Sequence, residues 1–186
     1  MDDPPSFRHP GIRPRPSVGR ALDMAARWAF PGAITALLLL ATAAPFGVPG
    51  QAELQAAVAL ASVFFWSLFR PAAMPPVLVF LLGLLADLLG YAPPGVGVLS
   101  LLLAGGIAFR FRRVLVRQGF LTVWLVFAVV ATGAALLDWA LTALLTFRLL
   151  APGPALFQAA LSCGIYPALA MLLTRAHQSL AAPERA

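Results

Sequence analysis

The sequence predicts an all-α integral membrane protein, a bundle of six transmembrane helices with both termini in the cytoplasm. Composition indicates the class, since 61% of the 186 residues are hydrophobic and only 11% are charged. Soluble domains average about 45–50% apolar and about 25% charged residues. Apolar runs recur along the whole chain, so a cleaved signal peptide cannot account for them. The placement of the arginines then gives the number of spans.

The predicted spans follow one another with short connections. A spanning helix needs about 20 apolar residues, within a range of roughly 17–25. Prolines punctuate the connections, and Pro31 falls in the opening turn of the first helix, where proline is tolerated. We expect helices over residues 28–44, 53–69, 75–90, 96–111, 119–147 and 155–174.

Each later span has a feature of its own. Glu53 opens the second helix, where a negative charge suits a helix N-terminus. The second and third spans are short for a bilayer, and the fifth is long enough to tilt or protrude. The sixth contains Cys163, the single cysteine of the chain, which we interpret as a small core residue.

Small residues recur along one face of the fourth and of the fifth span. Such stripes let membrane helices approach closely, because association in lipid depends on packing. We interpret them as internal packing faces, which become partner surfaces only if one is left uncovered. Their residues are Gly97, Ser100, Ala104 and Ala108 in the fourth span, and Ala128, Ala131, Ala135, Asp138 and Thr142 in the fifth.

The arginines orient the spans. Apart from Arg148, the arginines lie in four segments. These are the N-terminal segment, the connection after the second span, which contains Arg70, the stretch between residues 110 and 117, and the C-terminal tail. Six crossings bring all of these segments to one side, whereas five or seven would scatter them over both sides. The positive-inside rule therefore predicts cytoplasmic termini.

The chain divides into one membrane domain with two polar ends. We expect residues 1–27 to form a disordered, basic, proline-rich cytoplasmic arm, residues 28–175 the six-helix domain, and residues 176–186 a short cytoplasmic tail. The arm is either a solvated tail without a role or a contact for anionic lipid head groups. In the second case each basic residue adds about 1 kcal/mol. Nucleic-acid binding is not indicated, because the topology rule already accounts for the charge.

Three acids, Glu53, Asp87 and Asp138, are expected to share the outer side of the membrane. An unpaired carboxylate inside a span costs about 2.5–3.5 kcal/mol, so Asp87 needs a partner or water. In one interpretation Asp87 and Asp138 are hydrated, or pair with Arg148 or with hydroxyl groups, and serve packing. In a second they line a polar pocket between the third, fourth and fifth helices, open to the periplasm or to a partner helix. A cation or proton pathway is the third.

No catalytic or cofactor-binding pattern is evident. His9 and His177 both lie in the tails, and the chain contains no lysine that could complete a phosphate-binding loop. Three scattered acids are a poor ligand set for a metal ion. An intramembrane aspartyl pair would need two adjacent carboxyls, and no flanking signature supports one. We therefore expect a protein that is not an enzyme and holds no cofactor or metal.

The stretch from Arg70 to Leu103 carries the most informative pattern. It contains a proline after a short turn, a helical face, a proline-rich turn and a leucine-rich helix. The residues of this pattern are Phe80, Gly83, Asp87, Gly90 and either Gly95 or Gly97. Together with the six short spans, the basic connection after the fourth span and Asp138 in the fifth, the pattern resembles the MreD family. These are rod shape-determining membrane proteins of bacteria.

The resemblance implies a non-enzymatic scaffold of the cell-elongation complex that makes peptidoglycan, in the bacterial inner membrane. The implied partners are an MreC-like bitopic protein, a RodA-like glycosyltransferase, a class B penicillin-binding protein and, indirectly, MreB filaments. The family fold is similar to that of the substrate-binding subunits of energy-coupling-factor transporters, so a subunit that binds a small solute or vitamin is the alternative. The predicted outer loops are short and rich in Pro, Gly and Ala, which favours the scaffold. We expect Asp87 to matter more than Asp138, because Asp87 lies on the motif face.

Overall fold

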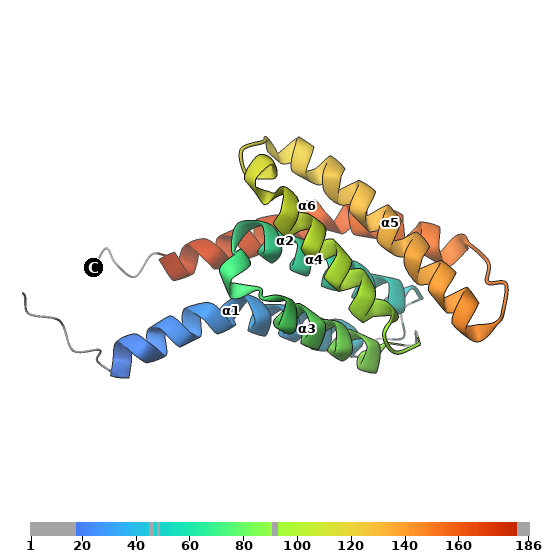
Figure 1. Ribbon diagram of the computed structural model, residues 1–186, viewed down its shortest axis with the longest axis horizontal. Coiled ribbons are helices and arrows are strands. Elements are labelled where there is room, and N and C mark those ends of the chain that lie inside the picture. The colour runs from blue at the N-terminus through green and yellow to red at the C-terminus, as the bar shows by residue number, and fades with distance from the viewer. Residues whose placement is uncertain (1–17, 45–46, 48, 91–92, 182–186) are drawn as a thin grey trace, which may run out of the picture.

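The computed structural model describes residues 18–44, 47, 49–90 and 93–181, with side chains between residues 28 and 176 of these ranges. The described chain is all-helical (Figure 1). The six predicted helices are confirmed, and their inner boundaries fall within a few residues of the predicted ones. The elements are α1 (Val18–Ala43), α2 (Gln51–Phe69), the short 3₁₀ helix η1 (Pro71–Ala73), α3 (Pro76–Leu89), α4 (Val96–Leu115), α5 (Phe120–Thr146) and α6 (Gly153–Ala181).

The first and last helices are longer than predicted. α1 begins at Val18 instead of residue 28, and α6 continues to Ala181 instead of residue 174. Both extensions are rich in strong helix formers such as Ala, Leu and Arg, and neither contains proline. Residues 18–27 of the predicted arm are thus helical. The expected disorder of the arm concerns residues 1–17, which lie outside the described residues, as do residues 182–186 of the tail.

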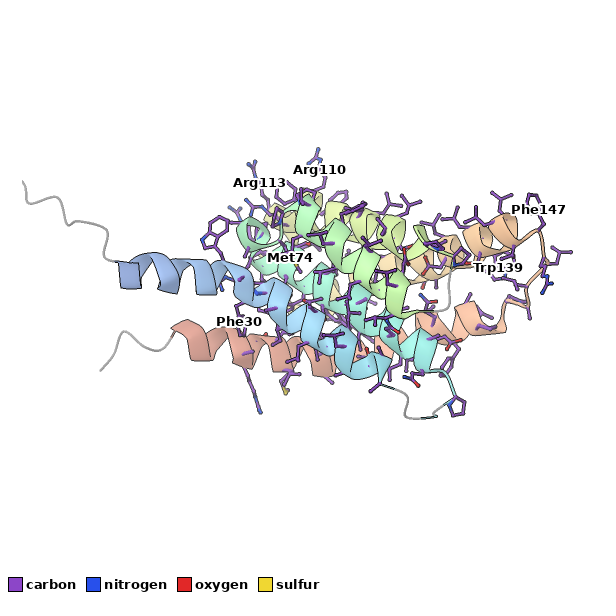
Figure 2. The ribbon with its side chains drawn as sticks, turned by 90° about the horizontal axis from the view of Figure 1, so that it is seen from below. Phe30, Met74, Arg110, Arg113, Trp139 and Phe147 are labelled. Atoms are coloured by element: carbon purple, nitrogen blue, oxygen red, sulfur yellow. The ribbon has the colours of Figure 1, made fainter. Side chains whose placement is uncertain are left out.

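Successive helices run in opposite directions, so the connections gather at two ends of the bundle (Figure 1). One end, here called the arginine end, contains the start of α1, η1, the α4–α5 connection and the end of α6. Its described basic side chains are Arg70, Arg110, Arg112, Arg113, Arg117 and Arg175. The other end, here called the distal end, contains the three remaining connections and Arg148. Figure 2 shows Arg110 and Arg113 lying far from Phe147 of the distal end.

The core of the bundle is built around α2, which contacts each of the other five helices. A helix that is apolar on all sides is stable only when it is buried, and α2 is buried almost throughout from Ala57 to Leu68. Phe64 of α2 packs edge-on against Phe127 of α5 and Tyr166 of α6, with ring centroids 5.2 and 6.0 Å away. This aromatic cluster joins three helices near the centre of the molecule.

The outer surface of the bundle is apolar. Three helical segments are long and apolar enough to cross a membrane, namely α2, α5 and Gly153–Ala176 of α6, while Trp28–Ala43 and α3 are shorter apolar helices. α5 is mostly uncovered, and Val129 at its middle is 74% exposed. Soluble monomers rarely expose contiguous apolar patches of more than a few hundred Å². The helices therefore have the character of a membrane protein.

Candidate functional site

Asp87 links the end of α3 to the start of α4, and Asp87 together with the residues that it binds, Gly95, Gly97 and Val98, is here called the joint. Its side chain is only 8% exposed and accepts three backbone hydrogen bonds from the first turn of α4. Oδ2 accepts from Gly95 at 2.6 Å and from Val98 at 3.3 Å, and Oδ1 accepts from Gly97 at 2.9 Å. The first amides of a helix have no partner inside the helix and carry partial positive charge. Asp87 is therefore an N-terminal cap supplied by the preceding helix, which satisfies its carboxylate inside the protein.

Two glycines let the carboxylate reach these amides. Gly95 has a φ of 101°, in the left-handed region that side chains rarely adopt, and it turns the chain into α4. At Gly97 a Cβ would collide with Oδ1 of Asp87. The sequence left open whether Gly95 or Gly97 is the last residue of the motif. Both belong to the joint, Gly95 for its backbone conformation and Gly97 for its lack of a side chain.

The remaining motif residues take separate positions. Gly83 brings α3 against α4, since a Cβ there would lie 2.6 Å from the Cα of Val98. Gly90 ends α3 and donates its N–H to Ala86 O at 2.8 Å. Phe80, by contrast, is 45% exposed. The expected single face is thus divided, with Gly83 and Asp87 against α4 and Phe80 on the outer surface.

Asp138 ties three helices together. Its Oδ1 accepts a hydrogen bond from the Ser100 hydroxyl of α4, and its Oδ2 accepts from the Gln158 amide of α6 at 3.1 Å. Neither Asp87 nor Asp138 forms an ion pair with Arg148 or with any other basic side chain that the structure describes. Of the predicted pairings, the hydroxyl partner is the one found. Gln158 was missed by the sequence reasoning, although a lone amide within an apolar run was a signal available for it.

A cavity of about 540 Å³ lies between the distal halves of five helices. The predicted pocket between the third, fourth and fifth helices is present, and α2 and α6 complete its walls. Its polar lining side chains are Glu53, Gln55, Asp87, Ser100, Asp138, Trp139, Thr142 and Gln158. Among the side chains that the structure describes, no group of His, Cys, Asp and Glu could hold a metal ion.

A second hollow is an apolar groove of about 790 Å³ between α4 and α5, on the outer surface of the bundle. The groove residues on α4 recur at steps of one, three and four, which places them along one seam of the helix. These α4 positions are Ser100, Leu103, Ala104, Ile107, Phe111, Val114 and Leu115, and Gln118 of the α4–α5 connection lies beyond the end of the helix. α5 contributes the opposite wall, with Val129, Gly133 and Leu137 near its middle.

The predicted small-residue stripes are largely covered. Ala104 and Ala108 of α4 and Ala131 and Ala135 of α5 are buried. They pack the bundle internally, as the first interpretation expected. The uncovered face is instead the line of larger residues beside them, exemplified by Val129, which sequence periodicity within one helix did not single out.

No protein-family model, curated protein or solved structure matches this chain.

Proposed function

We propose that this protein is a non-enzymatic membrane scaffold of the bacterial cell-elongation complex, which makes peptidoglycan, and that it controls rod shape by docking partner transmembrane helices. The observation that carries the proposal is the groove between α4 and α5. The resemblance of the Phe80–Gly97 pattern to the MreD family supplies the cellular setting. The implied location is the inner membrane, with six crossings and the arginine end in the cytoplasm.

The groove has the chemistry of a helix-docking surface in lipid. Helices associate in membranes by close packing, and small residues at the floor of an interface permit it. Ala104, Gly133 and Ala134 provide such a floor, and the exposed side chains of Leu103 and Val129 form the rims. The seam spacing on α4 suits a third helix laid along the pair. The occupant we propose is the single transmembrane helix of the MreC-like partner.

The other partners follow from the same complex. A RodA-like glycosyltransferase and a class B penicillin-binding protein would be assembled with the MreC-like protein, and MreB filaments would be reached indirectly. The exposed Phe80 is available for a further helix, because it lies outside the α3–α4 contact.

The test is to fill the groove and score cell shape. Gly133 has open space around its Cβ position, so Gly133→Leu should fold and block the groove. Gly164 on α6 is equally open and lies outside the groove, which makes Gly164→Leu the matched control. In cells depleted of the native protein, Gly133→Leu should give rounded cells and lose co-purification of the MreC-like partner, while Gly164→Leu restores rods. Rods and normal co-purification with Gly133→Leu at native expression would refute the docking site.

The alternative function, a small-solute or vitamin-binding subunit of an energy-coupling-factor-type transporter, is favoured by the distal cavity of about 540 Å³. Binding pockets for small molecules are typically about 300–1,000 Å³. Pulldown from native membranes separates the two functions. An ATPase with a coupling subunit, together with normal rod shape after depletion and lost solute uptake, would support the transporter.

A further inference from the structure

We propose that the distal cavity binds a small organic cation, an ammonium or guanidinium group carried on an apolar body. This site goes beyond the scaffold role and does not depend on it, because the groove and the cavity share only Ser100 and Ala134 among their lining residues.

The cavity has acidic side chains and no basic ones among the described residues that line it. Glu53, Asp87 and Asp138 contribute carboxylates from three different helices. Asp87 is held by the amides of α4, whereas Glu53 has no hydrogen-bond or ion-pair partner within the described part of the chain. Glu53 therefore offers a ligand in the cavity a carboxylate that no basic side chain or amide of the described residues already holds.

The donors of the cavity are largely occupied within the protein. The Ser100 hydroxyl and the Gln158 amide both donate to Asp138. The Trp139 indole N–H donates to Leu150 O at 3.1 Å. What remains for a ligand among the described lining residues is one free hydroxyl, that of Thr142, and otherwise acceptors, so the cavity suits a group that carries several N–H donors. Ammonium and guanidinium groups have this property.

Gln55 is an independent indication of a ligand. It is only 5% exposed and lines the cavity, and its Nε2 reaches Ala86 O at 3.5 Å. No residue in the described ranges donates to its Oε1. Its Oε1 is therefore a free acceptor on the cavity wall. A donor on a ligand in the cavity would supply the partner that the protein does not.

The walls fit an apolar body. Ala56, Ala59, Leu60 and Leu101 line the cavity beside the indole ring of Trp139. The hydrogen bond to Leu150 fixes that ring, and Trp is the side chain that attracts a cation most strongly through its ring face. Figure 2 shows Trp139 towards the distal end, where Leu150 and Ala151 of the α5–α6 connection and Pro154 of α6 also line the cavity.

The test uses 2-phenylethylammonium as the probe, on the purified full chain in detergent micelles, with binding followed by calorimetry. Its neutral match is 2-phenylethanol and its anionic match is 3-phenylpropanoate. We expect saturable binding of the ammonium compound, binding of the alcohol weaker by about tenfold or more, and none of the anion, since hydrogen bonds to charged groups have this magnitude.

Variants locate the site. Glu53→Gln removes a carboxylate with no described partner, so the fold should persist and ammonium binding should weaken about tenfold. Trp139→Leu should weaken binding as well, whereas Thr122→Val, which alters the groove and not the cavity, should leave it unchanged. Asp138→Asn is a secondary variant, because Asp138 also joins three helices.

Three outcomes would overturn the proposal. Equal binding of the alcohol and the ammonium compound would show an apolar pocket without charge selection. Unchanged binding in both Glu53→Gln and Trp139→Leu would place the probe elsewhere. Occupation of the cavity by a partner polypeptide, with no amine binding to the isolated chain, would also exclude a small-molecule site. None of these results depends on cell shape, so a failed cation site and a failed scaffold are distinguishable.

Discussion

Replacing Asp87 by leucine should destabilise the first turn of α4 and leave the rest of the bundle folded. The substitution removes the acceptor of three backbone amides, those of Gly95, Gly97 and Val98. A buried amide left without a partner costs about 1–3 kcal/mol. Water at the distal end offsets part of this cost, so a loss of about 3 kcal/mol for the three amides together is a reasonable magnitude.

Asparagine at the same position should cost less. Its amide oxygen can replace Oδ2 and keep the bonds from Gly95 and Val98, while its NH₂ group would face the N–H of Gly97. Loss of one bond is worth about 1 kcal/mol. Asp87→Asn is therefore expected to lie between the native protein and Asp87→Leu.

Amide hydrogen exchange in detergent measures this directly, because local opening raises the exchange rate of the amides concerned. Exchange at residues 95–98 should rise about 150-fold in Asp87→Leu and about 5-fold in Asp87→Asn, which are the factors equivalent to 3 and 1 kcal/mol. Asp138→Asn, which lies outside the joint, should leave these amides unchanged. Native exchange at residues 95–98 in Asp87→Leu, with helicity retained, would show that the cap is not what holds this turn. In cells, the proposed scaffold role adds that Asp87→Leu accumulates normally but fails to restore rods.

Three further substitutions, with Gly106→Ala as a control, test the contacts between α3 and the start of α4. Gly97→Ala places a Cβ against Oδ1 of Asp87 and should raise exchange at the α4 N-terminus, whereas Gly106→Ala on the same helix meets open space and should stabilise it by about 1 kcal/mol. Gly83→Ala forces α3 away from the backbone of Val98 and should lower the thermal midpoint of the detergent-solubilised protein; an unchanged midpoint would mean that the two helices are not in close contact. Gly95→Ala meets no atom, so its cost of about 1–2 kcal/mol in the same measurement is backbone strain alone, and no loss would contradict the left-handed turn.

The number and order of the helices could be predicted because each helix has its own signal in a short stretch of sequence. Apolar runs of spanning length, prolines between them and arginines in alternate connections depend only on short stretches of sequence. The joint was partly predictable for the same reason, since Asp87 and the glycines after it are close along the chain. An acid near a following helix N-terminus has few other partners.

The rest depends on how helices are rotated against one another, which periodicity within one helix does not encode. Phe80 shares the helical spacing of Gly83 yet lies on the outer surface and remains exposed. On its own helix Asp138 has only Ala and Thr along its stripe, and its partners Ser100 and Gln158 reach it from other helices. The contribution of Gln55 and Trp139 to the cavity likewise appears only when α2 and α5 are brought together.

The capped joint also bears on how the chain enters the membrane during synthesis. α3 has 14 residues, which at 1.5 Å per residue is about 21 Å, shorter than a hydrocarbon core of roughly 30 Å. Alone, α3 would carry the charged side chain of Asp87 near its end, and its insertion across the bilayer would be unfavourable. Once the first turn of α4 has emerged from the ribosome, its amides neutralise that charge, and Gly83 lets the two helices close against each other. A nascent chain that stops at residue 94 should therefore keep the end of α3 on the side of the membrane where it was made. A chain that continues through α4 should carry the α3–α4 connection across, and labelling of a cysteine introduced at residue 94 would distinguish the two. We therefore expect α3 and α4 to insert together as a helical hairpin, and neither helix to insert alone.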